Sequence, residues 1–185
     1  MSFEDLLKLA DGGDADAQYK IGHYYDAHKD YTRSFNYYQL SANKKHPDAL
    51  NYLGWKYQHG YGVNQNDDKA FTYYLLSVEQ KNIVGYANVA YCYEMGRGVT
   101  KDLKIALEYH HLYGDKNYID NCEFLILKQF SETLNETDYL YAYPLYIKHN
   151  HKDLDKLKTL INKKYIEAMH FMPSVLSDII ISFLL

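Results

Sequence analysis

The chain has 185 residues, enough for one domain of ordinary size or a short array of repeats. Its 20 Lys and Arg against 24 Asp and Glu give a net charge of −4, which argues against a nucleic-acid-binding protein. The hydrophobic content of 47% excludes a disordered chain. No stretch resembles a signal peptide or is long enough to span a bilayer, so we expect no membrane association and an intracellular, cytoplasmic location, in a host cell if the source is a microbe or a virus.

The first predicted element is a helix at residues 3–10. The sequence after it, residues 10–17, resembles the links between the repeats described next. We therefore expect this helix to cap one end of a repeat array.

Three segments, residues 17–25, 49–57 and 85–93, align with one another. Each has a small residue, an aliphatic residue, a second small residue and a Tyr at offsets 0, 4, 5 and 8; in the second segment these are Ala49, Leu53, Gly54 and Tyr57. With 3.6 residues per turn, these offsets fall on one helical face, so each segment is predicted to be a helix with these four anchors buried.

A second repeated block follows each of these helices, at residues 34–38, 70–74 and 106–110, with a spacing of 36 residues both times. The loop between the two helices carries Gly60-Tyr61-Gly62-Val63 in the second copy and Gly96-Arg97-Gly98-Val99 in the third. The glycines are expected to end the first helix, and Asn66 and Asp102 to cap the second. The first copy lacks this loop and is four residues shorter.

This pattern resembles the Sel-1-like repeat (SLR), a relative of the tetratricopeptide repeat. The resemblance implies an all-α, α-α superhelical solenoid of about three helix pairs with atypical capping helices at both ends. We predict a repeat array over residues 1–130, with repeats at about 15–46, 47–82 and 83–117 and a degenerate fourth from residue 118. Residues 131–185 are predicted to form a C-terminal helical cap.

Catalysis finds little support in the sequence. Two cysteines, Cys92 and Cys122, cannot form a disulfide framework and are expected to be small core residues. Nine histidines are present, but none lies at a recognised zinc spacing, so we expect no metal and no cofactor. A metal-dependent hydrolase is the third candidate function. The first two candidates are described in the next two paragraphs.

The SLR resemblance implies a non-catalytic adaptor that binds an unidentified protein or peptide. In such superhelices the first helices of the repeats line the concave side, and the residues between their anchors are expected to face outward there. The partner-binding residues predicted on this basis are Tyr19, His23, Asp26, Asn51, Trp55, Gln58, Tyr91 and Glu94. Trp55, with Tyr91 at the same repeat position, is the expected anchor, with packing against a neighbouring helix as the alternative.

A second function comes from the C-terminal stretch. Residues 172–185, with Pro173 at the start and a Ser-Phe-Leu end, are similar to the first helix of an F-box. This resemblance implies a ubiquitin-ligase substrate adaptor that docks on the ligase's small adaptor subunit. A terminal helix that seals the last repeat is the alternative.

Overall fold

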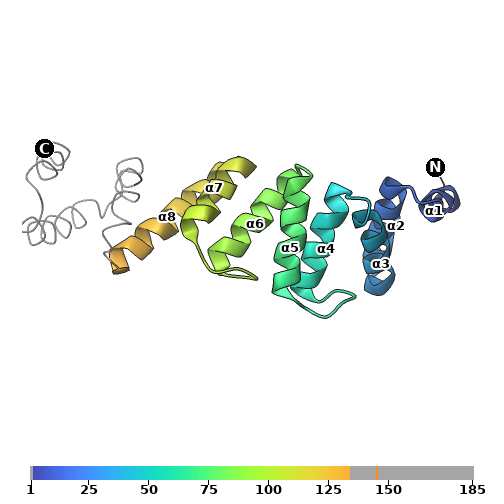
Figure 1. Cartoon of the computed structure of the whole chain (residues 1–185), viewed down its shortest axis with the longest axis horizontal. Helices are drawn as coiled ribbons and strands as arrows, with labels where there is room; N and C mark the ends of the chain where they lie inside the picture. Colours follow the sequence, from blue (N-terminus) through green and yellow to red (C-terminus); the bar gives the residue numbers. More distant parts are fainter. Residues whose placement is uncertain (1, 134–144, 146–185) are drawn as a thin grey trace, which may run out of the picture. The chain divides into compact units, whose positions relative to one another are not determined.

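A computed structural model describes residues 2–133 and residue 145 of the chain (Figure 1). Every regular element in this part of the chain is a helix. The helices are α1 (Phe3–Asp11), α2 (Ala15–Ala27), α3 (Tyr31–Ala42), α4 (Pro47–His59), α5 (Asp67–Glu79), α6 (Ile83–Met95), α7 (Leu103–Tyr113) and α8 (Lys116–Thr133). The chain divides into two units, Met1–Leu125 and Ile126–Leu185, and helices α1 to α7 lie entirely in the first.

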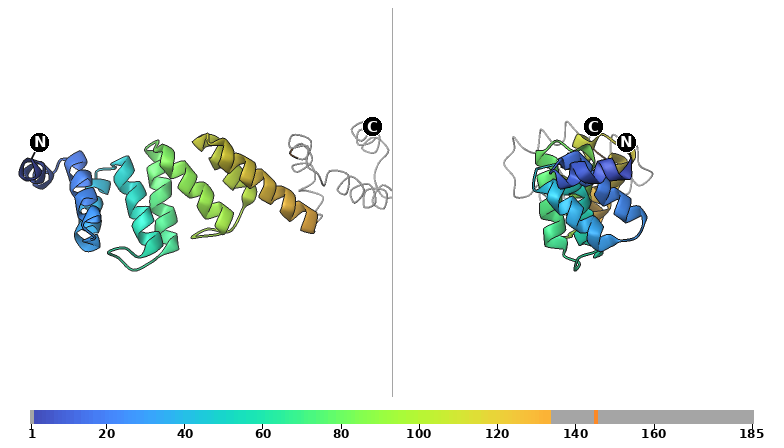
Figure 2. Two further views of the ribbon diagram at one scale, coloured as in Figure 1. Left: turned by 180° about the vertical axis from the view of Figure 1, so that it is seen from behind. Right: turned by 90° about the vertical axis from the view of Figure 1, so that its right-hand side faces the viewer.

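Helices α2 to α7 form three antiparallel pairs. The Ser41 hydroxyl near the end of α3 donates to the Ala15 carbonyl at the start of α2, and the Ser77 hydroxyl of α5 donates to the Pro47 carbonyl of α4. From α1 to α7, each helix packs against the next one in the chain, and Figure 2 shows α2 to α7 following one another in sequence order. The prediction of an all-α repeat fold is confirmed. We call α2, α4 and α6 the A helices and α3, α5 and α7 the B helices.

The helix ends follow the sequence closely. The side chains of Asn66 and Asp102 accept hydrogen bonds from the backbone amides of the first turns of α5 and α7, as predicted. Gly60 and Gly96 end α4 and α6 in the left-handed conformation, with φ of 72° and 71°. His46 caps α4 in an unexpected way, because its ring Nδ1 accepts from the amide of Ala49 at 3.3 Å.

The two helices of a pair approach closely where the A helix has a glycine. A Cβ atom placed on Gly54 would lie 2.6 Å from the ring of Tyr74, and one on Gly22 would lie 2.8 Å from the ring of Tyr38. Tyr38 and Tyr74 are fully buried. Gly54, one of the four predicted anchors, is therefore buried as expected and lies at the contact between the two helices of its repeat.

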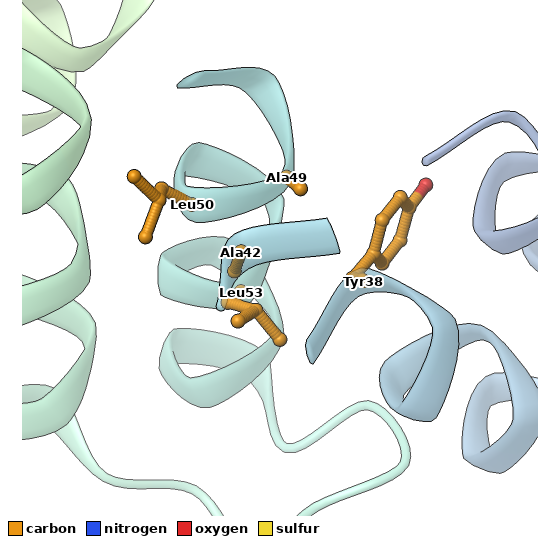
Figure 3. Close-up of a cluster of buried hydrophobic side chains, with 5 residues drawn as sticks. All are labelled: Tyr38, Ala42, Ala49, Leu50 and Leu53. Atoms are coloured by element: carbon orange, nitrogen blue, oxygen red, sulfur yellow. The ribbon is translucent and has the colours of Figure 1, made fainter. Parts of the chain in front are cut away.

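Tyrosine also builds the contacts within and between repeats. The fourth anchor of each A helix stacks on a Tyr of the B helix of its own repeat, in the pairs Tyr25–Tyr37, Tyr57–Tyr73 and Tyr93–Tyr109, at 5.5–6.0 Å between ring centroids. The same anchor meets a Phe of the preceding repeat edge to face, in the pairs Phe35–Tyr57 and Phe71–Tyr93. Figure 3 shows the buried cluster that joins the first repeat to the second, with Tyr38, Ala42, Ala49, Leu50 and Leu53.

The glycine loops dock on the preceding repeat. A Cβ atom on Gly62 would collide with the backbone carbonyl of Tyr31 at the start of α3, and one on Gly98 with that of Asp67 at the start of α5. The first repeat, which follows α1, has no such loop. Helix α1 covers this end of the array and packs Leu6 and Leu7 against a cluster containing Ile21. The helix predicted at residues 3–10 is confirmed.

Several sequence predictions concern residues beyond this part of the chain. Helix α8 covers the helix expected for the degenerate fourth repeat, but nearly all of the predicted C-terminal cap, residues 131–185, lies outside the described residues. The same holds for residues 172–185, which carry the F-box resemblance. The boundary near residue 130 stays a prediction. None of the helices described above is long and apolar enough to cross a membrane.

Candidate functional site

The predicted binding residues lie on the three A helices, and we call the surface formed by the outward side chains of α2, α4 and α6 the A-helix face. His23, Trp55 and Tyr91 occupy the same repeat position on these helices. All three are exposed, with Trp55 and Tyr91 each at 37% of their full accessibility. One partly exposed ring from each repeat therefore reaches the surface.

Tyr19 and His23 belong to an aromatic group at the junction of the first two repeats. The ring of Tyr19 stacks on that of His46 at 4.8 Å and lies 5.8 Å from that of Tyr52. His23 lies 6.0 Å from the Tyr52 ring. Burial, with the neighbouring Tyr52 and Asp48, raises the pKa of Tyr19 to about 12, so its hydroxyl stays protonated and can donate a hydrogen bond.

Trp55 lies in a second aromatic group, toward the loop end of α4. Its ring is stacked on Tyr61 at 4.9 Å and lies 4.7 Å from His59, whose Nδ1 faces the Trp55 carbonyl at 2.9 Å. Tyr61 in turn packs on Tyr31 of the first repeat at 4.8 Å. The indole is therefore held by neighbours on the surface. None of the ring contacts in the described part of the chain joins Trp55 to His23 or Tyr91.

Asn51 takes part in a polar junction between the second and third repeats. Its side-chain carbonyl accepts from the Asn88 amide at 2.7 Å, at the positions that Tyr19 and Tyr52 hold one repeat earlier. The Asn82 amide likewise donates to Asp48 at 2.6 Å, where the preceding junction has His46 and Asp16 at 3.0 Å. The A-helix face is thus aromatic over the first junction and rich in amides over the second.

Three of the polar residues predicted to bind a partner, Asp26, Gln58 and Glu94, do not extend outward. Gln58 is 8% exposed and accepts a hydrogen bond from the Tyr74 hydroxyl at 2.7 Å, so the expectation that it faces outward is wrong. Asp26 accepts from the Tyr38 hydroxyl at 3.2 Å, and Glu94 lies 3.3 Å from His110 Nε2. Each of these residues follows the small residue that faces the B helix by four positions, so both lie on the same face of the A helix. The small residues are Gly22, Gly54 and Ala90. All three side chains bind the B helix of their own repeat.

Sequence reasoning missed Tyr52, His46, His59, Tyr61 and Lys56. His59 follows Trp55 by one helical turn, and this spacing was visible in the sequence. Tyr52, His46 and Tyr61 meet their partners across a repeat junction, which the period of a single helix does not reveal. Lys56 is fully buried, and the signal for this was its place seven residues after Ala49, which is on the anchor face.

The two cysteines lie in the interior, as expected. Burial raises the pKa of the Cys92 and Cys122 thiols to about 12, so both are protonated near neutral pH and are poor nucleophiles. His110, which directly precedes His111 in the sequence, is buried and stacks on Tyr118 at 5.4 Å.

Comparison with known proteins supports the repeat assignment. The sequence profile of the Sel1 repeat matches residues 15–46, 47–82 and 83–117. A crystal structure of a Sel1 repeat protein from Oxalobacter formigenes is similar, with 26% identity and a TM-score of 0.57 over 65% of this chain and 96% of that one. The protective antigen c5321 of uropathogenic Escherichia coli, which displays an SLR fold, has 20% identity and a TM-score of 0.62. That match covers 89% of this chain but 37% of the antigen, so it bears on the fold alone. A search of curated proteins found no match.

Proposed function

Because the chain belongs to the Sel1 repeat family, we propose that it binds a protein or peptide segment on its A-helix face, with Trp55 as the central anchor. Sel1 repeats typically serve as scaffolds for protein–protein interaction and are generally not catalytic. The finer assignment, to this face and this residue, is ours.

The observation that carries the proposal is the state of the Trp55 side chain. Its indole is 37% exposed on the middle A helix and is supported by Tyr61 and His59. A large ring that is already ordered loses little conformational freedom on binding, and Trp is strongly enriched among residues that dominate interface energies. Tyr91 and His23 extend the same row to the neighbouring repeats.

Replacing Trp55 with Ala tests this proposal. Peptides selected from a displayed random library on the parent protein would be titrated against the parent and Trp55→Ala. Truncating a central aromatic anchor costs about 2–4 kcal/mol of binding free energy, so affinity should fall by roughly thirtyfold or more. Circular dichroism should show that the variant remains helical.

The matched control is Leu40→Ala, which removes an exposed apolar side chain from the B helix of the first repeat. It should leave the affinity for the selected peptides unchanged. If a folded Trp55→Ala variant binds them as tightly as the parent does, the proposed anchor is wrong.

A further inference from the structure

A buried ammonium group lies between the first and second repeats. Lys56 of α4 is fully buried, and its Nζ donates to Asp26 Oδ1 of α2 at 2.5 Å. The other oxygen of that carboxylate accepts from the Tyr38 hydroxyl of α3 at 3.2 Å. Through the Asp26 carboxylate, the Lys56 ammonium therefore connects the A helix of the second repeat to both helices of the first.

Aromatic rings surround the same ammonium. Its Nζ lies 5.2 Å from the ring centroid of Tyr31, 5.5 Å from that of Tyr38 and 6.0 Å from that of Trp55. These distances fall within the range of cation–π attraction. The ring faces and the Asp26 carboxylate together form a cage around one cation. Trp55 belongs to this cage and also to the A-helix face.

The next junction has no equivalent cage among the described residues. The positions of Asp26 and Lys56 are taken there by Gln58 and Cys92, neither of which carries a charge near neutral pH. The charged contact at that junction is Arg97–Asp67, at 3.4 Å with both side chains 33% exposed. The caged ammonium therefore distinguishes the junction that carries Trp55 from the one that follows it.

Stability alone is a poor explanation for such a group. Burial lowers the pKa of Lys56, and the hydrogen bond and charge of Asp26 oppose that shift. Replacing a buried ion pair with apolar side chains of similar size is often neutral or stabilising, whereas the pair demands one arrangement of its partners. The pair is therefore suited to fixing geometry.

We infer that Lys56 is a positioning residue of the binding face: its caged ammonium fixes the second repeat against the first and holds the Trp55 indole in one orientation. This inference rests on the proposed function for its biological meaning. Whether the Lys56 charge immobilises Trp55 can be measured without a binding partner.

The test uses the double variant Asp26→Asn with Lys56→Met, which removes both charges and keeps side chains of similar length. Trp55 is the only Trp in the chain, so intrinsic fluorescence reports on this site alone. We expect a helical protein with a melting temperature near that of the parent, in which acrylamide quenches Trp55 more efficiently and its anisotropy decays faster. A charge that affected only the electronic state of the indole would change the emission colour but neither of these quantities.

The matched control is Arg97→Met, which removes a charge from the second junction. It should leave quenching and anisotropy as in the parent. If the double variant folds and Trp55 remains as shielded and as immobile as in the parent, the inference is overturned.

Peptides selected as above should bind the double variant more weakly. If no peptide is found, the proposed function fails, while the fluorescence result still decides the role of Lys56.

A chemical rescue covers the case in which the double variant does not fold. The Lys56→Ala variant lacks the three carbons and the ammonium group beyond Cβ. The n-propylammonium ion matches this missing fragment in length and charge. Added n-propylammonium should restore the parent's anisotropy decay in this variant, and 1-propanol, of similar size but uncharged, should not. Equal rescue by both compounds, or by neither, would overturn a role for the charge.

Discussion

At the scale of single residues, the contact between the two helices of a repeat depends on a missing Cβ atom. Gly22 and Gly54 each face a buried Tyr ring of the B helix at a distance that leaves no room for a methyl group. The third repeat has Ala90 at this position and the smaller ring of His110 opposite, and both residues are buried. The size of the A-helix residue and that of the B-helix ring therefore compensate each other.

This relation predicts the effect of Gly54→Ala. Alanine is the better helix former by about 1 kcal/mol, but its methyl group would lie 2.6 Å from the Tyr74 ring. Overpacking typically costs about 1–3 kcal/mol, so we expect a net loss in the free energy of unfolding, measured by chemical denaturation. Adding Tyr74→His, which copies the third repeat, should recover part of the loss. A variant as stable as the parent would contradict this account.

The residue scale also shows where sequence reasoning succeeds and where it fails. Ala49, Leu53, Gly54 and Tyr57 are all buried, because their spacing alone places them on one face. The ion pair of the buried Lys56 could not be predicted, because its partner Asp26 lies thirty residues earlier and meets it across a repeat junction. The polarity of Lys56 and Gln58 indicates an exposed position, whereas both side chains are buried.

At the scale of elements, the glycine loops hold neighbouring repeats together. Gly62 and Gly98 have positive φ values of 77° and 67°, and each lies against the backbone at the start of the preceding B helix. The residue between the two glycines of each loop also contacts that helix. At the first junction Tyr61 packs on the ring of Tyr31, and at the second Arg97 forms an ion pair with Asp67. The sequence predicted the turn but not the surface on which it docks, since one loop carries no information about its neighbour.

Two glycine substitutions separate the effect of docking from that of backbone conformation. Gly98 and Gly114 both have positive φ, so Ala at either should cost about 1–2 kcal/mol from the left-handed conformation. A Cβ atom on Gly98 would collide with the Asp67 carbonyl, whereas one on Gly114 meets nothing within 4 Å. We therefore expect Gly98→Ala to lower the free energy of unfolding clearly more than Gly114→Ala. Equal losses in parallel denaturation curves would show that the loop does not depend on close docking.

At the scale of the whole molecule, the array follows from a local pattern repeated three times. Each copy specifies the same helix pair, so the order and type of the helices could be predicted from spacing alone. The contacts between copies could not, because each junction uses different chemistry at equivalent positions. Tyr19 with Tyr52 is an aromatic contact, whereas Asn51 with Asn88 is a hydrogen bond between amides.

The buried hydroxyls and thiols predict a loss of stability in alkali. Burial raises the pKa of Tyr19, Cys92 and Cys122 to about 12, and it also raises that of Tyr38 and Tyr74, from ordinary values of 10.0 for Tyr and 9.0 for Cys. Folding therefore favours the protonated forms. The associated stabilisation is complete below the unfolded-state pKa values and is lost as the pH rises through about 9–12.

Circular dichroism and tyrosinate absorbance, followed together in a pH titration, check this prediction. The free energy of unfolding should be nearly constant up to about pH 9 and should fall above it. The last tyrosines should ionise together with the loss of helical signal. Complete ionisation of all tyrosines near their ordinary pKa in a protein that stays helical would contradict it.

The docking of each glycine loop on the repeat before it has a consequence for how such a gene can lengthen. A duplicated copy of the second or third repeat brings a loop that can seat on the B helix ahead of it. A copy of the first repeat, inserted within the array, would have no loop and would leave the start of the preceding B helix uncovered. Growth by duplication is therefore directional: new 36-residue units fit after the first repeat, and the shorter 32-residue unit is suited only to the beginning of the array.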